Sequence, residues 1–273
     1  TKADGQITAL VQNGRPVESV SGGEFYLIAN QTPFYGESGG QVGDIGRING
    51  KDFAIEVTDT KKKIDGMVVH CCKMIDGTVK TGDIASFEVD EENRDKIRAN
   101  HSVTHLLHCA LRDILGDHVT QKGSYVCAGR ARFDISHPKQ ITNEELRKAE
   151  DIVNAAVRKN YKTVTRIMTP DEAIKLGAMA LFGEKYGETV RVVSMENDDE
   201  VFSRELCGGT HVRSTGDIGY FNIVSESAVA AGIRRVEFVT GHAAEKYAQD
   251  IEDIKGAMAE IWQLQRSILS KAP

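Results

Sequence analysis

The hydrophobic pattern of this chain changes its period near Asp90. Before that residue, short apolar or alternating runs are broken by turn dipeptides such as Asn13-Gly14 and Asn49-Gly50. Asn-Gly favours two-residue hairpins, because both central positions of such a turn need positive φ. After Asp90, apolar residues recur at helical spacing. The sequence therefore predicts a β-rich first part and a second part that begins with a long helix.

We interpret residues 1–90 as an antiparallel β barrel or sandwich, because the predicted strands are short and follow one another through turns. The predicted strands are Ile7–Val11, Phe25–Ala29, Phe53–Val57, Met67–Cys71 and Ile84–Val89.

Residues 91–240 mix helices with strands, which is typical of the α+β class. A long helix is expected from Asp90 to Gly116, a second after the capping box of Thr142 and Glu145, and a short third over 169–177. The strand-like segments are Thr163–Met168, Thr189–Met195, Ile218–Val224 and Ile233–Val239.

Residues 241–273 predict a C-terminal helix with a heptad-like apolar stripe of about three heptads. Packing of this stripe against its own domain and pairing in a coiled coil remain equally open. The stripe consists of Tyr247, Ile251, Ile254, Met258, Ile261 and Ile268.

The composition is that of an ordinary globular protein, and the length of 273 residues favours about two domains. No apolar stretch approaches the ~18 residues of a membrane span. A net charge of −6 argues against nonspecific coating of nucleic acid, although local basic patches can bind RNA. Five cysteines, with Cys71 and Cys72 adjacent, indicate a reducing, cytoplasmic setting.

Two short motifs carry the clearest chemistry. His101 and His105 are four residues apart in the predicted helix, so they share a face and can reach one metal ion. Cys207 and His211 offer a thiolate and an imidazole across a Gly-Gly turn. Zinc selects nitrogen and sulfur ligands of this kind. Together the four residues predict a zinc site.

The neighbours of these ligands leave several alternatives open. We expect His108, on the same helix face, to face solvent or to pack on a neighbour. The hydroxyl of Thr104 either lies near the metal or bonds its own helix backbone. Ser102 stands where zinc proteases have a glutamate, which argues against protease chemistry. Four protein ligands are typical of a structural zinc, but a loose ligand would allow a catalytic one.

Residues 32–44 form another glycine-rich run. The run lacks the Gly-Lys-Ser/Thr ending of a phosphate loop. It is either a wide turn of the barrel or a surface where backbone approaches a ligand closely.

In these motifs the chain resembles the alanyl-tRNA synthetase family, specifically its editing region. Free-standing editing proteins of the AlaX type share the zinc motifs. The motifs occur in the order of the family and are specific as a set: Thr32–Asp44, Asn100–His108, Val119–Ser124, Gly177–Tyr186, Leu206–His211 and Ala231–Glu237.

The resemblance implies a β-barrel subdomain packed on a zinc-containing α+β editing core. It also implies hydrolysis of tRNA(Ala) mischarged with serine or glycine. Such hydrolysis is needed because an alanine pocket cannot strongly exclude glycine or serine. The implied zinc ligands are His101, His105, Cys207 and His211.

The same resemblance implies substrate-contacting residues. Thr104 and Gln121 would lie in the editing pocket as the catalytic candidates, and Gly39, Gly40 and Gln41 would lie over it. We expect water to attack the aminoacyl ester at the 3′-terminal ribose, with zinc or its shell orienting water or substrate.

Candidates for contacts with the tRNA backbone are Lys122, Arg234 and Arg235, although ordinary surface charges would explain them equally well. The chain begins at Thr1 without a leader, and we interpret it as a fragment of a synthetase rather than as a free-standing editor. The rest of the synthetase would then be its partner. Because no aminoacylation unit is identifiable, we expect no charging of tRNA.

Two rival functions belong to other classes. One is a noncatalytic, zinc-stabilised RNA-binding module, which would protect the aminoacyl ester. The other is a metal-dependent amidase or esterase of small molecules, which the missing glutamate after His101 disfavours.

Overall fold

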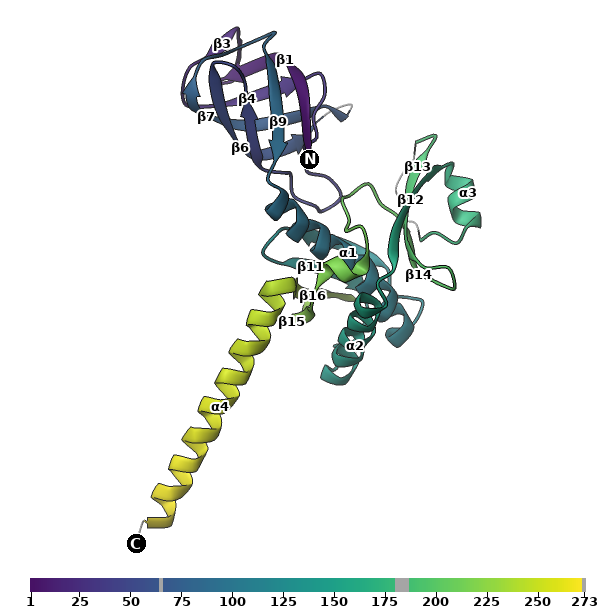
Figure 1. Cartoon of the computed structure of the whole chain (residues 1–273). Coiled ribbons are helices and arrows are strands. Elements are labelled where there is room, and N and C mark those ends of the chain that lie inside the picture. Colours follow the sequence, from purple (N-terminus) through teal and green to yellow (C-terminus); the bar gives the residue numbers. More distant parts are fainter. Residues whose placement is uncertain (64–65, 180–186, 272–273) are drawn as a thin grey trace.

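The structure is a computed structural model that describes residues 1–63, 66–179 and 187–271. It has the α+β fold that the sequence predicts: a β barrel, a central α+β unit, a small side sheet and a projecting C-terminal helix (Figure 1). Residues 180–186, which end one family motif, lie outside the described residues. Within the described residues, no helix has the length and apolarity needed to cross a membrane.

The N-terminal strands form a closed barrel, so the barrel rather than the sandwich is correct. Closure arises because β1 pairs with both β4 and β9, which gives the circular order β1-β4-β7-β6-β5-β9. The interior is apolar and includes Leu27, Ile55 and Phe87. Strand bounds are β1 (Lys2–Gln12), β2 (Arg15–Val17), β3 (Ser19–Val20), β4 (Glu24–Ala29), β5 (Gly46–Asn49), β6 (Phe53–Lys62), β7 (Val68–Gly77), β8 (Val79–Lys80) and β9 (Ile84–Val89).

The two Asn-Gly turns differ. Asn13 and Gly14 have φ values of 53° and 74°, as a two-residue hairpin between β1 and β2 requires. The second turn does not lie at Asn49-Gly50 as predicted: Asn49 pairs with Ala54 and Gly50 donates to the Phe53 carbonyl at 3.0 Å, so residues 51 and 52 form the tip of the hairpin.

The central unit is built on α1 (Glu91–Leu115), which leaves the barrel directly after β9. Asp90 caps its N-terminus by accepting from the amide of Asn93, and Gly116 ends it, as predicted. Together with α2 (Asn143–Lys159), α1 covers a four-stranded sheet of order β10-β11-β16-β15. The sheet strands are β10 (Gln121–Val126), β11 (Ala131–Ser136), β15 (Phe221–Ala230) and β16 (Ile233–Thr240).

A three-stranded side sheet, β12-β13-β14, stands beside α1 with the short helix α3 (Figure 1). The capping boxes predicted for α2 and α3 are both present. The strand expected from Ile218 begins later, at Phe221, because Thr215–Ile218 forms a 3-10 turn. The remaining bounds are β12 (Lys162–Met168), α3 (Pro170–Lys175), β13 (Val190–Glu196) and β14 (Val201–Leu206).

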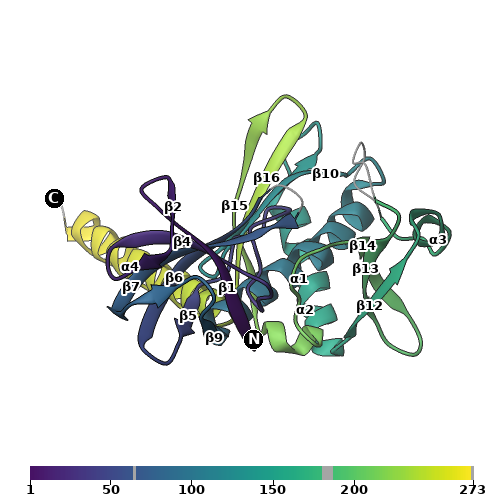
Figure 2. The same cartoon turned by 90° about the horizontal axis from the view of Figure 1, so that it is seen from above.

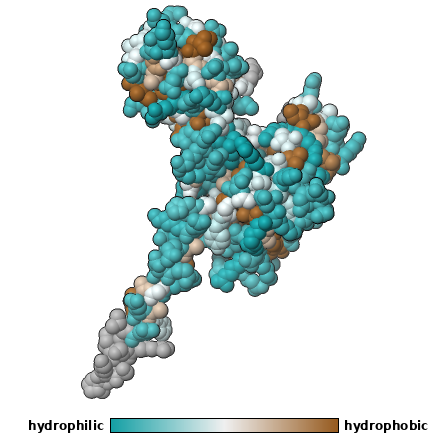
Figure 3. Space-filling view, viewed as in Figure 1, coloured by the Kyte–Doolittle hydropathy of each residue, from teal (hydrophilic) through white to brown (hydrophobic). Residues whose placement is uncertain are grey.

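The C-terminal helix α4 (Gly241–Lys271) extends away from the body of the molecule (Figures 1 and 2). Near its start it packs on β15 and β16, and Ala244 is fully buried there. Farther along, Ile254, Met258 and Ile261 are each more than half exposed. Brown apolar patches accordingly interrupt the hydrophilic surface of the helix in Figure 3. The described part of the apolar stripe beyond the first turns is therefore not packed against its own domain.

Candidate metal centre and its pocket

Two segments of the chain meet at one cluster of side chains. His101 and His105 project from the middle of α1, where both side chains are buried. Cys207 and His211 come from the turn that follows β14. One potential ligand atom from each of these four residues lies within 4.8 Å of each of the others. The structure therefore brings together the four residues that the sequence pairs by spacing.

The distances within the cluster suit a small tetrahedral ion. Cys207 Sγ lies 3.5 Å from His101 Nε2 and 3.3 Å from His211 Nε2. With bonds of about 2.0–2.3 Å, the ligand atoms of a tetrahedral zinc are roughly 3.3–3.8 Å apart. The donor set of three imidazoles and one thiolate is also one that zinc prefers. These four residues can therefore hold a metal ion such as zinc.

The turn carrying two of the ligands is held from both sides. Arg191 of β13 donates from Nη1 to the carbonyls of Cys207 (2.9 Å) and Gly209 (2.6 Å). On the α1 side, a Cβ on Gly209 would lie 2.0 Å from Cε1 of His101. Only glycine fits at this position, so the turn lies directly against the helix.

Gln41, from the glycine-rich run of the barrel, orients His101. Its Oε1 accepts from the backbone amide of Thr210 (2.8 Å), and its Nε2 donates to the Thr210 hydroxyl (3.0 Å). Because these contacts fix the amide orientation, the 2.7 Å contact between Oε1 and His101 Nδ1 requires a proton on Nδ1. The lone pair of His101 Nε2 is then free to bind a metal. In known metal sites, a ligating histidine likewise donates its other ring N–H to a neighbouring acceptor.

His211 has a comparable outer partner. Its Nδ1 lies 3.2 Å from the hydroxyl of Ser102, which also accepts from the amide of Val212 at 3.1 Å. Nε2 of His211 faces Cys207 and the metal position, whereas Nδ1 contacts the supporting hydroxyl of Ser102. Ser102 thus occupies a supporting position beside the ligands.

The electrostatics of the cluster favour a thiolate. Burial alone would raise the pKa of Cys207, but the imidazoles of His101, His211 and His105 lower this pKa well below 9.0. Burial and the neighbouring His101 lower the pKa of His211 to about 3, so its ring is neutral at pH 7. Burial would also lower the pKa of His105, but the charges of Glu205 and Cys207 raise it to about 9. The thiolate and the carboxylate therefore attract a positive charge to this position, which a proton or a metal ion can provide.

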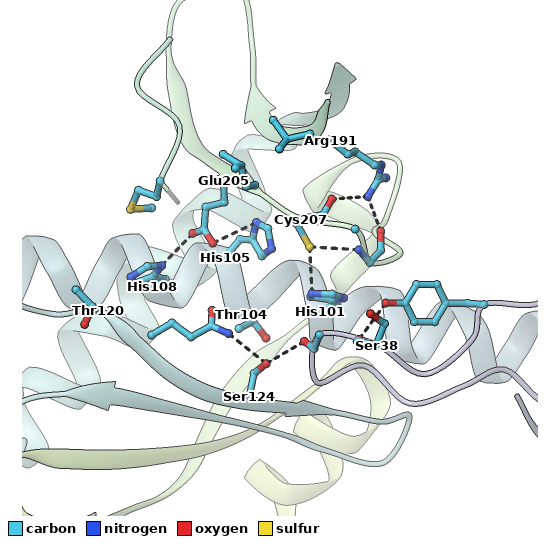
Figure 4. A pocket seen from close by; sticks show the side chains of 18 of the residues that line it. Ser38, His101, Thr104, His105, His108, Thr120, Ser124, Arg191, Glu205 and Cys207 are labelled. Atoms are coloured by element: carbon cyan, nitrogen blue, oxygen red, sulfur yellow. Dashed lines mark hydrogen bonds and ion pairs between the residues drawn. The ribbon is translucent and has the colours of Figure 1, made fainter. Parts of the chain in front are cut away.

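A cavity of about 610 Å³ opens directly beside the cluster (Figure 4). Its wall comes from the glycine-rich run of the barrel, from α1, from β10 and from the side sheet. The cavity is within the ~300–1,000 Å³ range of small-molecule pockets. His101, His105 and Cys207 line it, so a ligand in the cavity would touch the metal site.

Thr104 and Gln121 also line this cavity. The Thr104 hydroxyl donates to the carbonyl of Asn100 at 3.0 Å, so the backbone bond that was one of the two sequence alternatives is present, and a role near the metal stays a prediction. Its oxygen keeps lone pairs with which it can accept a further hydrogen bond. Gln121 Nε2 donates to the hydroxyl of Ser124 at 3.4 Å.

The glycine-rich run is attached to the edge of β10. Val126 donates to the carbonyl of Gly40 at 2.8 Å, and Val42 donates to the carbonyl of Val126 at 3.1 Å. At Gly40, φ is +84° and a Cβ would lie 2.5 Å from the carbonyl oxygen of Ser124. Gly39 lines the cavity, whereas Gln41 is fully buried behind it. The glycines therefore let the run approach β10 closely, and the close approach to a ligand stays a prediction.

The three basic candidates differ in their surroundings. Arg234 makes a two-pronged ion pair with Glu226, and Arg235 makes one with Asp134. Lys122 is exposed on β10, next to Gln121. The charges of both arginines are thus already balanced within the protein.

Glu205 is a site residue that spacing arguments missed. It lies on β14 two residues before Cys207, lines the cavity, and is 8% exposed. Its Oε1 accepts from His108 Nδ1 at 3.1 Å, and the His108 ring packs edge-on against Phe133. His108 is thus not one of the four clustered residues. Alternation along a strand places residues i and i+2 on one face, which is the signal that could have found Glu205.

Two protein-family profiles match the chain. Residues 190–237 match the family described as "Threonyl and Alanyl tRNA synthetase second additional domain", a range that includes β13, β14 and the Cys207 turn. Residues 1–93, which include the barrel, match the family of class II (A) tRNA synthetases.

Similar full-length proteins carry the name alanine–tRNA ligase. The chain is 54% identical to the one from Chelativorans sp. (strain BNC1) over 95% of its own length and 30% of that protein. It is 57% identical to the one from Parvibaculum lavamentivorans over 91% of its own length and 29% of that protein. The chain thus spans about 30% of the length of these curated relatives. Identity at this level across nearly the whole chain places it in the alanyl-tRNA synthetase family, where it spans a part that includes the editing-domain region.

Proposed function

We propose that this chain hydrolyses the ester of tRNA(Ala) mischarged with serine or glycine, with zinc bound by His101, His105, Cys207 and His211. The observation that carries this proposal is the shared cavity. One chamber of about 610 Å³ is lined by metal-site residues together with Thr104 and Gln121. The chamber is large enough for a terminal nucleoside that carries a small aminoacyl group.

The residues of the chain divide the work as follows. Thr104 already donates its proton to Asn100, so towards the cavity its oxygen acts as an acceptor. The hydroxyl of a seryl group can therefore donate to Thr104. Gln121, held by Ser124, borders the same space and positions the ester or the attacking water.

In the hydrolysis, water adds to the ester carbonyl carbon and the bond to the ribose oxygen breaks. The water supplies one proton to the released ribose hydroxyl, and its second proton passes to solvent as the amino acid leaves as the carboxylate. Zinc, when bound, fixes the ligand turn against α1 and can polarise or orient a neighbouring oxygen. Four protein ligands favour the fixing role.

The RNA would approach over the exposed rim of the cavity. Lys122 is our choice for a phosphate contact, because its charge is exposed and it neighbours Gln121. Arg234 and Arg235 are weaker candidates, since each is engaged by a carboxylate.

The five free cysteines support the cytoplasmic setting that we propose for the chain.

The test is a deacylation assay with Ser-tRNA(Ala), Gly-tRNA(Ala) and Ala-tRNA(Ala). We expect the zinc-loaded chain to remove serine and glycine and to spare alanine. Thr104→Val should slow removal of serine more than removal of glycine, because only serine has a hydroxyl to donate. Thr58→Val, on the exposed face of the barrel, is the matched control. Binding of the tRNA with protection of the seryl ester would instead support the noncatalytic RNA-binding module.

A further inference from the structure

One buried carboxylate in the cavity has no lysine or arginine as its partner within the described residues. Glu205 is 8% exposed, and carboxylates this deeply buried are normally paired with a cation. Within residues 1–63, 66–179 and 187–271, its only ion-pair neighbours are two imidazoles, His108 Nδ1 at 3.1 Å and His105 Nδ1 at 3.8 Å. No lysine or arginine of these ranges pairs with it.

The two oxygens of Glu205 are differently engaged. Oε1 accepts a hydrogen bond from His108, which fixes the direction of the carboxylate. Oε2 is 3.8 Å from His105, a distance too long for a hydrogen bond. Figure 4 shows Glu205 between these two imidazoles, on the wall that faces Thr104. One carboxylate oxygen is therefore available to a ligand in the cavity.

The position of Glu205 matches the chemistry of an aminoacyl ester. Such an ester carries an α-ammonium on the carbon next to the reacting carbonyl, and serine carries its hydroxyl one carbon farther on. His108, which holds Glu205, follows Thr104 by one helical turn, and side chains at this spacing are about 5–6 Å apart. Glu205 and Thr104 both line the cavity, which thus offers an anionic acceptor for the ammonium and a neutral acceptor for the serine hydroxyl.

We propose that Glu205 binds the α-ammonium of the aminoacyl group and makes the pocket specific for free aminoacyl esters over esters without that charge. His108 is a positioning residue, which acts by holding the carboxylate. This inference rests on the proposed deacylation and extends it to the substrate group that the cavity recognises. A role of Glu205 confined to the metal site would give no dependence on the substrate amine.

The test compares two substrates that differ only at the amine. Ser-tRNA(Ala) carries the ammonium, and glyceroyl-tRNA(Ala), the corresponding ester of glyceric acid, carries a hydroxyl in its place. We expect wild-type chain to prefer Ser-tRNA(Ala) in kcat/KM by about 10- to 100-fold, the usual range for a hydrogen bond to a charged group. In Glu205→Gln this preference should fall to about 3-fold or less, through a loss on Ser-tRNA(Ala) alone.

Three controls keep the outcomes apart. Glu205→Asp retains the charge and should keep part of the preference, and Glu56→Gln changes an exposed carboxylate of the barrel and should keep all of it. Zinc content is measured in every variant. Equal loss on both substrates, or a wild-type chain indifferent to the amine, overturns the ammonium site. A wild-type chain that hydrolyses neither ester would instead refute the proposed deacylation.

Discussion

At the scale of single residues, the metal centre depends on how closely the ligand turn approaches α1. Gly209 has no room for a side chain, because a Cβ there would lie 2.0 Å from the His101 ring. Its neighbour Gly208 faces open space, with no atom within 4 Å of an added Cβ. Of the two adjacent glycines, only Gly209 is therefore required by the close packing of the turn against His101.

This difference gives a direct prediction. Gly209→Ala must displace either the turn or His101, so we expect loss of bound zinc and of serine deacylation. Gly208→Ala should keep bound zinc close to wild type, because an added Cβ there meets no protein atom within 4 Å. Metal analysis of the two purified variants, with the deacylation rate measured on the same samples, checks this. Zinc at one equivalent in Gly209→Ala would show that the ligands tolerate a wider spacing.

Local rules explain why the four clustered residues could be predicted and why their supporting contacts could not. His101 and His105 are paired by helical geometry, and Cys207 and His211 by a short turn. The contact of Gln41 with His101 joins residues sixty positions apart, so it depends on how the barrel sits on the core. Spacing along the sequence holds no information about that placement.

At the scale of elements, a buried ion pair joins the glycine-rich run to α1. Arg94 of α1 donates to both carboxylate oxygens of Asp44 and also to the carbonyl of Pro33 at 3.0 Å. Both side chains are almost completely buried. This pair fixes the far end of the run that carries Gln41.

Loss of this pair should affect both stability and the metal site. Arg94→Met leaves the Asp44 charge buried without a partner, which typically costs about 3–5 kcal/mol of unfolding free energy. Zinc affinity should fall as well, because Gln41 loses its fixed position. Arg98→Met, which breaks a surface pair with Asp95, should cost below about 1 kcal/mol. Urea unfolding of both variants checks the difference, and equal costs would contradict the role of the buried pair.

The barrel contains a titratable group that makes its stability depend on pH. His70 is fully buried beside Phe34 and Phe87, and burial lowers its pKa to about 4 despite a hydrogen bond to the carbonyl of Leu27. Between pH 6.5 and pH 4 the unfolded chain therefore binds a proton that the folded barrel does not. Stability contributed by neutral His70 is present above pH 6.5 and is lost as the pH falls towards 4.

The loss over this range should be on the order of 3 kcal/mol, at about 1.4 kcal/mol per pKa unit. In His70→Asn the acid limb of the stability curve should be flatter between pH 6.5 and 4. Unfolding midpoints across this range measure the effect, with the exposed His242→Asn as the control. An unchanged slope in His70→Asn would show that other groups cause the acid sensitivity.

Strands could be predicted where an apolar face alternates with a polar one. They could not be predicted where polar residues that belong to the site are buried. In β14, the polar residues Ser203 and Glu205 are buried on one face, while Phe202 and Leu206 on the other face are only partly buried, so hydrophobicity gives the wrong face. In β10, glycine and polar residues dominate, because its edge is covered by the glycine-rich run. In β11, buried Ala131, Phe133 and Ile135 do alternate with polar residues, a regular signal that marks this strand in retrospect.

At the scale of the whole molecule, the cavity exists only where the barrel run, α1, β10 and the side sheet meet. The sequence indicates each of the first three as a motif, but their convergence is a property of the fold. The projecting α4 shows the same limit, because its heptad-like stripe predicts a helix without telling what the stripe contacts. Composition and charge indicated the class of protein, whereas only the motifs indicated the residues of the site.

The central claim is that the four clustered residues hold zinc beside the cavity in which mischarged tRNA(Ala) is deacylated. The most direct measurement determines zinc content and the rate of Ser-tRNA(Ala) deacylation together in wild type and in Cys207→Ala, with Cys127→Ala as the control outside the cluster. We predict that Cys207→Ala loses both, whereas Cys127→Ala keeps both. Undiminished deacylation in a zinc-free Cys207→Ala chain would contradict the account.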